Sequence, residues 1–214
     1  MPLRGQEGFV MTGRTVEIVL ASGSKARREM LAAAGVHFTV QAADVDEPAI
    51  RARLLAEDKH TPPKKIAEVL AIVKAEDVSA KHPGAVIIGA DQVLAFDGAL
   101  LRKASNVEAA GEALKRLRGR THELHSAVVL AKDGKVTFTH IDTARLAMRD
   151  FSDAFLADYL NRAADRVTQT VGAYELEGLG IQLFEKVEGD YFTILGMPLL
   201  PVLAELRQRG IIAA

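Results

Sequence analysis

The spacing of hydrophobic and polar positions changes several times along the chain, and each change predicts a separate helix or strand. Continuous or alternating apolar runs predict strands at 16–21, 36–42, 85–88, 93–96, 99–101, 121–131 and 135–148. Helical spacing predicts helices at 25–34, 61–82, 105–119 and 198–210, one more capped by Ser152, and a short helix within the polar loop 44–58. A strand–helix–strand order followed by hairpins predicts an α/β protein with a mixed sheet.

Turn and capping residues mark several of the expected boundaries. The Asp–Gly pair at 97–98 separates two apolar runs and predicts a hairpin with a type I′ turn. The Glu–Gly–Asp turn at 188–190 predicts a second hairpin near the C-terminus. Thr61, followed by proline, predicts a hydroxyl N-cap, and Ser105 with Glu108 has the spacing of a capping box.

The composition is that of an ordinary globular protein: 49% hydrophobic, 26% charged, with a net charge of −1 over 214 residues. This length suits one domain, which we place at 15–214 after a flexible extension at 1–14. The balanced charge and the 5% of aromatic residues argue against a nucleic-acid partner. The absence of cysteine excludes disulfides and thiolate nucleophiles. No apolar run approaches the roughly 20 residues of a membrane helix and no signal peptide is evident, so we expect no membrane partner and a cytoplasmic location.

Candidate chemistry begins in the turn that follows the first strand. Ser22–Gly23–Ser24 joins that strand to a helix, and free backbone N–H groups at a helix N-terminus favour phosphate. The stretch lacks the spacing of a P-loop and of a dinucleotide fingerprint. From this segment alone, a phosphate site and a simple Ser-capped turn are equally good interpretations.

Charged residues elsewhere gain meaning mainly as a set. Asp91 follows a buried apolar run and two small residues, which favours catalysis or metal binding over a turn cap. Taken singly, Glu47 and Lys103 read as ordinary solvated side chains, and Lys74 reads as a snorkelling lysine at the edge of an apolar face. Glu177 precedes Gly178 and Gly180, which permit a tight backbone, but this glycine signal is weak. The histidines show no zinc spacing, whereas carboxylates together with phosphate oxygens suit a hard cation such as Mg²⁺. No nucleophile elbow supports a serine hydrolase.

Three ordered stretches together resemble the Maf family of nucleoside triphosphate pyrophosphatases. They are LASGSKARREML, IIGADQVLAFDG and GAYELEGLGIQLFEKVEGDYFTILGMPL, and the resemblance runs from about residue 16 to the C-terminal helix. It implies an elongated mixed β-sheet flanked by helices, in two lobes with a central cleft, as in the Maf and ITPase folds. It also implies a homodimer that cleaves a nucleoside triphosphate to the monophosphate and pyrophosphate with a divalent metal, Mg²⁺ or Mn²⁺.

Carried over position by position, the resemblance assigns roles to nine residues. Asp91, Lys74, Lys103 and Glu47 match the catalytic set, with Asp91 and Glu47 also as metal ligands, and Ser22, Ser24, Arg27, Gln92 and Glu177 match substrate-binding positions. Two departures weaken the match. The family's Pro–Arg/aromatic–Arg after the second serine is Lys–Ala–Arg here, and its Gly–Lys–Pro is Arg–Lys–Ala.

Gln92 and Glu177 resemble the subgroup that acts on 7-methyl-GTP. A carboxylate can accept hydrogen bonds from the N1–H and the exocyclic amine of guanine, and it attracts a cationic 7-methylguanine further. Thymine offers one N–H between two carbonyls and cannot pair in this way. The sequence therefore predicts an enzyme of nucleotide-pool sanitation with a guanine preference. A dTTP/UTP pyrophosphatase and a non-enzymatic, nucleotide-binding regulator of cell division are the alternatives.

Overall fold

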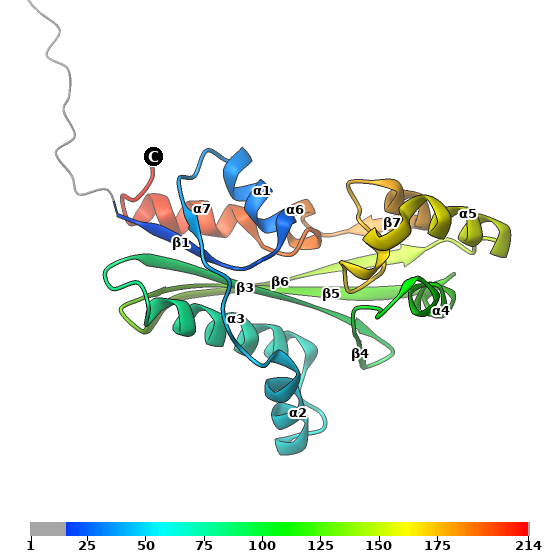
Figure 1. Cartoon of the computed structure of the whole chain (residues 1–214), viewed down its shortest axis with the longest axis horizontal. Helices are drawn as coiled ribbons and strands as arrows, with labels where there is room; N and C mark the ends of the chain where they lie inside the picture. Colours follow the sequence, from blue (N-terminus) through cyan, green and yellow to red (C-terminus); the bar gives the residue numbers. More distant parts are fainter. Residues whose placement is uncertain (1–15, 214) are drawn as a thin grey trace, which may run out of the picture.

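The computed structural model describes residues 16–213, which form an elongated molecule built on a seven-stranded sheet (Figure 1). The strands lie in the order β2, β1, β3, β5, β6, β7, and β4 pairs with β3 outside this path. Their bounds are β1 Ile18–Ala21, β2 Thr39–Val40, β3 Val86–Phe96, β4 Ala99–Leu101, β5 Thr121–Lys132, β6 Lys135–Met148 and β7 Phe184–Glu188. β1 is parallel to β2 and β3, and the other pairs are antiparallel, so the predicted mixed sheet is confirmed. The extension predicted at 1–14 lies outside the described residues.

Helices cover both faces of the sheet. The α-helices are α1 Lys25–Ala33, α2 Glu47–Glu57, α3 Pro63–Ser79, α4 Val107–Leu117, α5 Asp153–Ala163, α6 Tyr191–Ile194 and α7 Leu199–Gln208, with 3₁₀ helices η1 Ala164–Thr168 and η2 Leu179–Leu183. In Figure 1, α3 lies below the sheet, α1 and α7 lie above it, and at the far end α5 lies beside β7 while α4 lies below the long strands.

The buried apolar side chains fall into three groups that define two lobes. In the first lobe, one group packs α3 on one face of the sheet, and a second packs α1 and α7 on the other. The second lobe is built around α4, α5 and the far halves of the long strands. β3 runs through both lobes: its residues up to Ala90 contribute to the first lobe, and Leu94 and Phe96 belong to the second.

The central strand differs from its prediction. The two short runs expected at 85–88 and 93–96 form one continuous strand of 11 residues, and Asp91 lies at its midpoint and not after its end. Both neighbours explain this continuity. β5 pairs with β3 from Ile87 to Ala95, across Asp91, and β1 pairs with its first half. A polar residue in the interior of a paired strand is read easily as a strand end, because pairing is not visible in the sequence.

Two predicted strands are wrong or shortened. The expected strand at 36–42 contributes only the two residues of β2, both exposed at the edge of the sheet, where one neighbour alone supports them. The expected hairpin at 188–190 does not form. Asp190 instead caps the one-turn helix α6, accepting a hydrogen bond from the backbone N–H of Thr193 at 3.0 Å.

Two predicted helix caps are also displaced. Asn106, and not Ser105, caps α4 by accepting from the N–H of Ala109 at 2.8 Å. Thr61 does not cap α3, because its hydroxyl donates backwards to the carbonyls of Asp58 and Leu54. Ser152 caps α5 as predicted, and residues 97 and 98 both have positive φ, as a type I′ turn requires.

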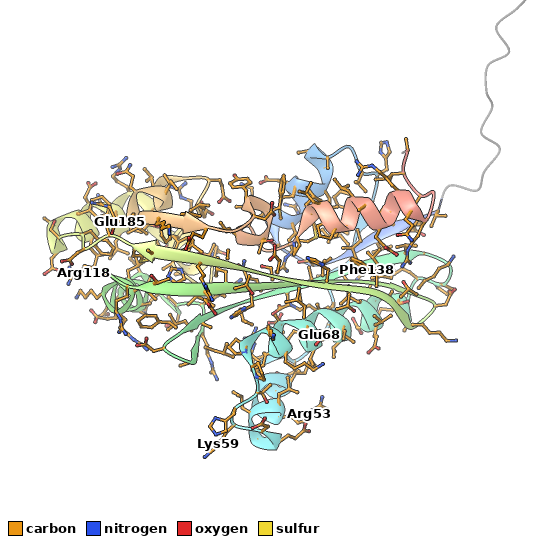
Figure 2. All side chains as sticks on the ribbon, turned by 180° about the vertical axis from the view of Figure 1, so that it is seen from behind. Arg53, Lys59, Glu68, Arg118, Phe138 and Glu185 are labelled. Atoms are coloured by element: carbon orange, nitrogen blue, oxygen red, sulfur yellow. The ribbon has the colours of Figure 1, made fainter. Side chains whose placement is uncertain are left out.

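Helix α2 projects away from the sheet on the α3 side, as Figure 2 shows from behind at the labelled Arg53. No residue of α2 is fully buried, and its Ile50 and Leu54 pack half-buried against the core group that includes α3. Within residues 16–213, no helix is both long and apolar enough to span a bilayer.

Candidate active site

The centre of the candidate site is an ion-pair chain between three elements. Asp91, on β3, is 4% exposed, and its Oδ1 lies 2.6 Å from the ammonium of Lys74 on α3. The same ammonium lies 2.7 Å from Oε1 of Glu47, the first residue of α2. Asp91 shares a sheet face with Ile87 and Val93, because side chains alternate along a strand. The residues predicted from three separate segments therefore meet where the two lobes join.

Close packing of α3 on β3 brings Lys74 to Asp91. Gly89 makes this possible, because a Cβ at that position would lie 2.4 Å from the carbonyl oxygen of Ala71 and 2.7 Å from the Cβ of Ala75. The sequence indicated that small residues before Asp91 allow a close approach, and the structure identifies α3 as the element that approaches.

Arg51 extends this row of ion pairs and was missed by the sequence analysis. Its Nη2 lies 2.8 Å from Oε2 of Glu47, so that Glu47 is held between two cations. The Nε atom of Arg51 is buried, with no hydrogen-bond partner in the described part of the chain. The i,i+4 spacing of the two residues within the predicted short helix was the available signal.

Arg27 lies on the other side of the central strand and is 8% exposed. Its Nε donates to the carbonyl of Gly196 at 2.9 Å, and its Nη1 donates to Ser22 Oγ at 3.0 Å and to the carbonyl of Ala90 at 2.9 Å. The guanidinium thus ties the β1–α1 turn, β3 and the segment after α6 together. Burial lowers the pKa of Arg27, and the charges of Asp91 and Glu47 oppose that change.

The serines of the β1–α1 turn leave donors free. Ser24 caps α1, accepting from the N–H of Arg27 at 3.4 Å, and Ser22 Oγ accepts from Arg27 and from the N–H of Ser24 at 3.3 Å. Both hydroxyl groups act here as acceptors, so their hydrogens remain available. The first turn of α1 holds no acidic residue. This arrangement suits an anion at the N-terminus of the helix.

The pKa values of the two carboxylates are shifted in opposite directions. Burial raises the pKa of Asp91 above its usual range, and the nearby Lys74 and Arg27 compensate only in part. Burial also works to raise the pKa of Glu47, but the hydrogen bond and charge of Lys74, with the charge of Arg51, bring it below its usual range. The Oδ2 atom of Asp91 is buried without a partner among residues 16–213. Asp91 therefore has the character of a proton acceptor, and Glu47 that of a fixed negative charge.

Lys103 follows β4 and completes the cluster electrostatically. The residue is exposed, yet burial of its ammonium among neighbouring atoms lowers its pKa, and the positive charges of Arg27 and Lys74 lower it further. A cation repelled by two others gains from a polyanion placed among them. Four predicted residues, Glu47, Lys74, Asp91 and Lys103, thus act on one another together with Arg27.

No hydrogen bond between Gln92 and Glu177 is found within residues 16–213. Gln92 follows Asp91 and points to the opposite face of the sheet, where its amide nitrogen donates to Ser126 Oγ at 2.9 Å and to the carbonyls of Thr193 and Ile194 at 3.0 Å. Glu177 is exposed in the second lobe, and no hydrogen bond or ion pair of its side chain is found within 16–213.

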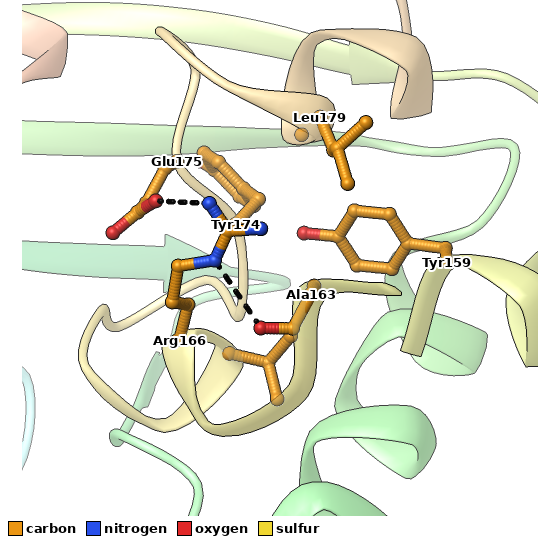
Figure 3. A pocket seen from close by; sticks show the side chains of 8 residues that line it. Tyr159, Ala163, Arg166, Tyr174, Glu175 and Leu179 are labelled. Carbon is orange, nitrogen blue, oxygen red and sulfur yellow. Dashed lines mark hydrogen bonds and ion pairs between the residues drawn. The ribbon is translucent and has the colours of Figure 1, made fainter. Parts of the chain in front are cut away.

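The loop that carries Glu177 is nonetheless tightly built. It borders a cavity of about 10 Å³ lined by Tyr159, Tyr174, Glu175 and Leu179, where Arg166 approaches Glu175 (Figure 3). A Cβ at Gly180 would lie 2.5 Å from the carbonyl oxygen of Glu175, so the tight backbone predicted for this glycine is observed. Glu177 is held at the surface by a rigid support.

The donor set fits a hard divalent cation only with help from a substrate. Asp91 and Glu47 offer carboxylate oxygens near one another, and the unpartnered Oδ2 of Asp91 is a suitable ligand atom. In the part of the chain that the structure describes, no cluster of three or more His, Asp or Glu side chains is placed to hold a metal. Mg²⁺ is commonly held by one or two carboxylates and substrate phosphates, and this set matches that pattern.

On a mixed α/β sheet, the cations Arg27, Lys74 and Lys103 lie close enough to influence one another's charge, beside the N-terminus of α1, and this arrangement defines a site that suits a polyanion. The family model described as Maf-like protein matches residues 17–209, and the chain belongs to this family.

Close relatives carry two different names. The chain is 48% identical over 194 residues to a 7-methyl-GTP pyrophosphatase of Brucella abortus, covering 91% of this chain and 96% of that one. It is 50% identical over 192 residues to a nucleoside triphosphate pyrophosphatase of Paramagnetospirillum magneticum, covering 90% and 98%. A 7-methyl-GTP pyrophosphatase of Rhizobium etli is 45% identical over 198 residues, covering 92% and 98%. Identity alone does not separate the two names.

Proposed function

We propose that this protein is a nucleoside triphosphate pyrophosphatase that hydrolyses its substrate to the nucleoside monophosphate and pyrophosphate. The observation that carries the proposal is the buried Asp91, bonded to Lys74 at 2.6 Å, with its second oxygen unpartnered in the described part of the chain and Arg27 and Lys103 close by. A protein that only binds a triphosphate gains nothing from a carboxylate facing it. The names of the relatives, which are hydrolases of acid anhydrides, support the same activity.

Binding of the phosphates follows from the cations and the free donors. Lys74 has three N–H donors, and two are engaged by Asp91 and Glu47, so the third can meet a phosphate oxygen. Ser22, Ser24 and the N-terminus of α1 supply neutral donors, and Arg27 and Lys103 supply charge. Lys74 approaches β3 from one side and Arg27 from the other, so these residues would hold the triphosphate across the central strand.

The chemical step is an attack of water on the α-phosphorus. Asp91 accepts a proton from the attacking water as the new P–O bond forms, and the bond to the pyrophosphate oxygen breaks. The raised pKa of Asp91 makes this carboxylate a stronger base than an exposed one. Lys74 and Arg27 stabilise the negative charge that spreads over the transferred group.

A divalent cation, Mg²⁺ or Mn²⁺, belongs to this proposal, with Asp91 and Glu47 as its protein ligands. When bound, it neutralises phosphate charge and polarises the phosphoryl oxygens. Asp91 would then have one of two roles. It would either accept the proton of the attacking water itself, or ligate the cation and act on the water while bound to it.

The finer parts of the proposal concern the base and the assembly. We assign a guanine nucleotide, 7-methyl-GTP in particular, as the preferred substrate, with dTTP/UTP hydrolysis and a purely regulatory role in cell division as alternatives. We further propose a homodimer in the cytoplasm, with no nucleic-acid or membrane partner.

The test of the activity is Asp91→Asn. We expect pyrophosphate release from a nucleoside triphosphate to fall at least about 100-fold in the presence of Mg²⁺, since the amide cannot accept the proton. Asp158→Asn, an exposed residue of α5, is the matched control and should release pyrophosphate at the unmodified rate. Near-normal release by Asp91→Asn would remove this residue from the reaction. Absence of release from the unmodified protein with a panel of normal and modified triphosphates would favour the regulatory alternative.

A further inference from the structure

The one-turn helix α6 is held by side chains from the middle of the sheet. The carbonyl of Thr193 accepts three hydrogen bonds: from Ser126 Oγ at 2.7 Å, from Gln92 Nε2 at 3.0 Å and from the N–H of Gly196 at 3.1 Å. Gln92 also donates to the next carbonyl, that of Ile194, at 3.0 Å. A helix of four residues has little stability of its own, so these bonds decide where its C-terminal end lies.

Thr193 is anchored at its other atoms as well. It is fully buried, its N–H donates to Asp190 Oδ1 at 3.0 Å, and its hydroxyl donates to Asp142 Oδ2 on β6 at 2.9 Å. Ser126 is likewise fully buried. Buried polar groups that are all paired hold a unique geometry, because every alternative arrangement leaves a donor or acceptor unsatisfied.

This network continues directly to Arg27. The peptide N–H of Gly196 is bonded to Thr193, and the carbonyl of the same residue accepts from Nε of Arg27 at 2.9 Å. Gly196 has φ +108°, and a Cβ there would lie 3.5 Å from Nε and Nη2 of the guanidinium. The backbone of Gly196 therefore links the α6 network to Arg27 through a single residue.

We infer that Ser126 and Thr193 are positioning residues that set the orientation of Arg27 toward the substrate's phosphates. The inference rests on the proposed function. Ser126 lies on β5 and Thr193 on α6, and neither was singled out by the sequence. Because both residues connect to Arg27 through the backbone of Gly196, their loss should weaken binding of the phosphates themselves, whether or not a base is attached. The same reasoning gives Gln92 a structural task through its amide nitrogen, in addition to any contact with a base.

Ser126→Ala and Thr193→Val test the inference, with inorganic tripolyphosphate as a probe that carries no base. We expect each variant to weaken tripolyphosphate binding, measured by calorimetry, about threefold to tenfold, the range that loss of one hydrogen bond produces. The KM for GTP and the KM for UTP should both rise. Thr193→Ser, which keeps the hydroxyl, should restore most of the binding lost in Thr193→Val.

Thr137→Val is the matched control, because it removes a hydroxyl from β6 that bonds Arg209 at 2.8 Å, away from the network. It should leave tripolyphosphate binding unchanged. All measurements are made well below the unfolding temperature of each variant. Unchanged tripolyphosphate binding in a folded Ser126→Ala or Thr193→Val variant would overturn the inference. If the unmodified protein binds tripolyphosphate but hydrolyses no nucleotide, the proposed function fails while the positioning role is still tested by binding.

Discussion

At the scale of single residues, the second lobe contains a buried histidine that the catalytic site does not use. His122 is 1% exposed, its Nε2 lies 2.7 Å from the hydroxyl of Tyr174, and its Nδ1 is buried without a partner within residues 16–213. Burial lowers the pKa of His122 from 6.5 to about 4. In the folded protein the ring stays neutral at pH values where the unfolded chain carries a proton there.

This difference predicts a loss of stability in acid. Between pH 6.5 and about 4 the unfolded state binds a proton that the folded state does not, so the free energy of unfolding falls as the pH falls. The full effect is about 3 kcal/mol, since one pKa unit corresponds to about 1.4 kcal/mol. His122→Gln should remove this part of the pH dependence, as measured by urea unfolding at pH 7, 5.5 and 4.5.

His37→Gln, at an exposed position, is the control and should keep the pH dependence of the unmodified protein. Parallel stability curves for His122→Gln and the unmodified protein over this range would show that His122 does not contribute to acid unfolding.

At the scale of elements, the position of α3 against β3 joins stability to chemistry. The helix that carries Lys74 lies so close to Gly89 that an added Cβ would come within 2.4 Å of backbone. Backbone cannot move aside as a flexible side chain can, so a substitution must displace the helix itself. The ion pair of 2.6 Å between Lys74 and Asp91 depends on the same contact.

Gly89→Ala should therefore lower both the stability of the fold and the catalytic activity. We expect the free energy of unfolding to fall by about 1–3 kcal/mol, the usual cost of overpacking. We expect kcat/KM for nucleotide hydrolysis to fall as well, because Lys74 moves from Asp91. Gly111→Ala in α4 is a suitable comparison, since its Cβ would meet only the tip of Leu160 at 3.0 Å. Full activity in Gly89→Ala would mean that the site tolerates a displaced α3.

At the scale of the whole molecule, the contacts proposed for the phosphates and for the base lie in different lobes. The cations that suit phosphate surround the middle of β3, whereas Glu177 lies in the second lobe and is exposed. An exposed carboxylate competes with water for its hydrogen bonds, so it discriminates less than a buried one. The preference for guanine, expressed as a ratio of kcat/KM values, should therefore be modest. It should lie near the lower end of the range that a contact between a carboxylate and guanine can give.

We expect kcat/KM for 7-methyl-GTP to exceed the values for dTTP and UTP by about tenfold, which corresponds to about 1.4 kcal/mol. The direct measurement is kcat/KM for 7-methyl-GTP, GTP, dTTP, UTP and CTP on the unmodified protein. Gln92→Thr combined with Glu177→Gln should shift the preference toward pyrimidines. If dTTP or UTP is preferred by tenfold in the unmodified protein, the guanine assignment is wrong, although the pyrophosphatase activity stands.

Much of the fold and part of the site followed from the sequence, because they depend on local physics. The periods of apolar residues located most of the elements, glycines after α1, α4 and α7 marked their ends, and Ser152 and the 97–98 turn behaved as predicted. Asp91 stood out because apolar and small residues precede it. The short edge strand β2 and the turn at 188–190 could not be predicted, since both depend on neighbours distant in the sequence.

Only the tertiary structure decided which polar groups meet. Lys74 and Glu47 look like ordinary surface residues in the sequence. Nothing near them in the sequence indicates that the ammonium of Lys74 contacts the carboxylates of both Glu47 and Asp91. The links from Ser126 through Thr193 to Arg27 span β5, α6 and α1. Local sequence determines backbone preference and which face of an element is apolar. Hydrogen bonds between distant elements form only when the packing of the sheet sets their separation, and that separation is a property of the whole fold.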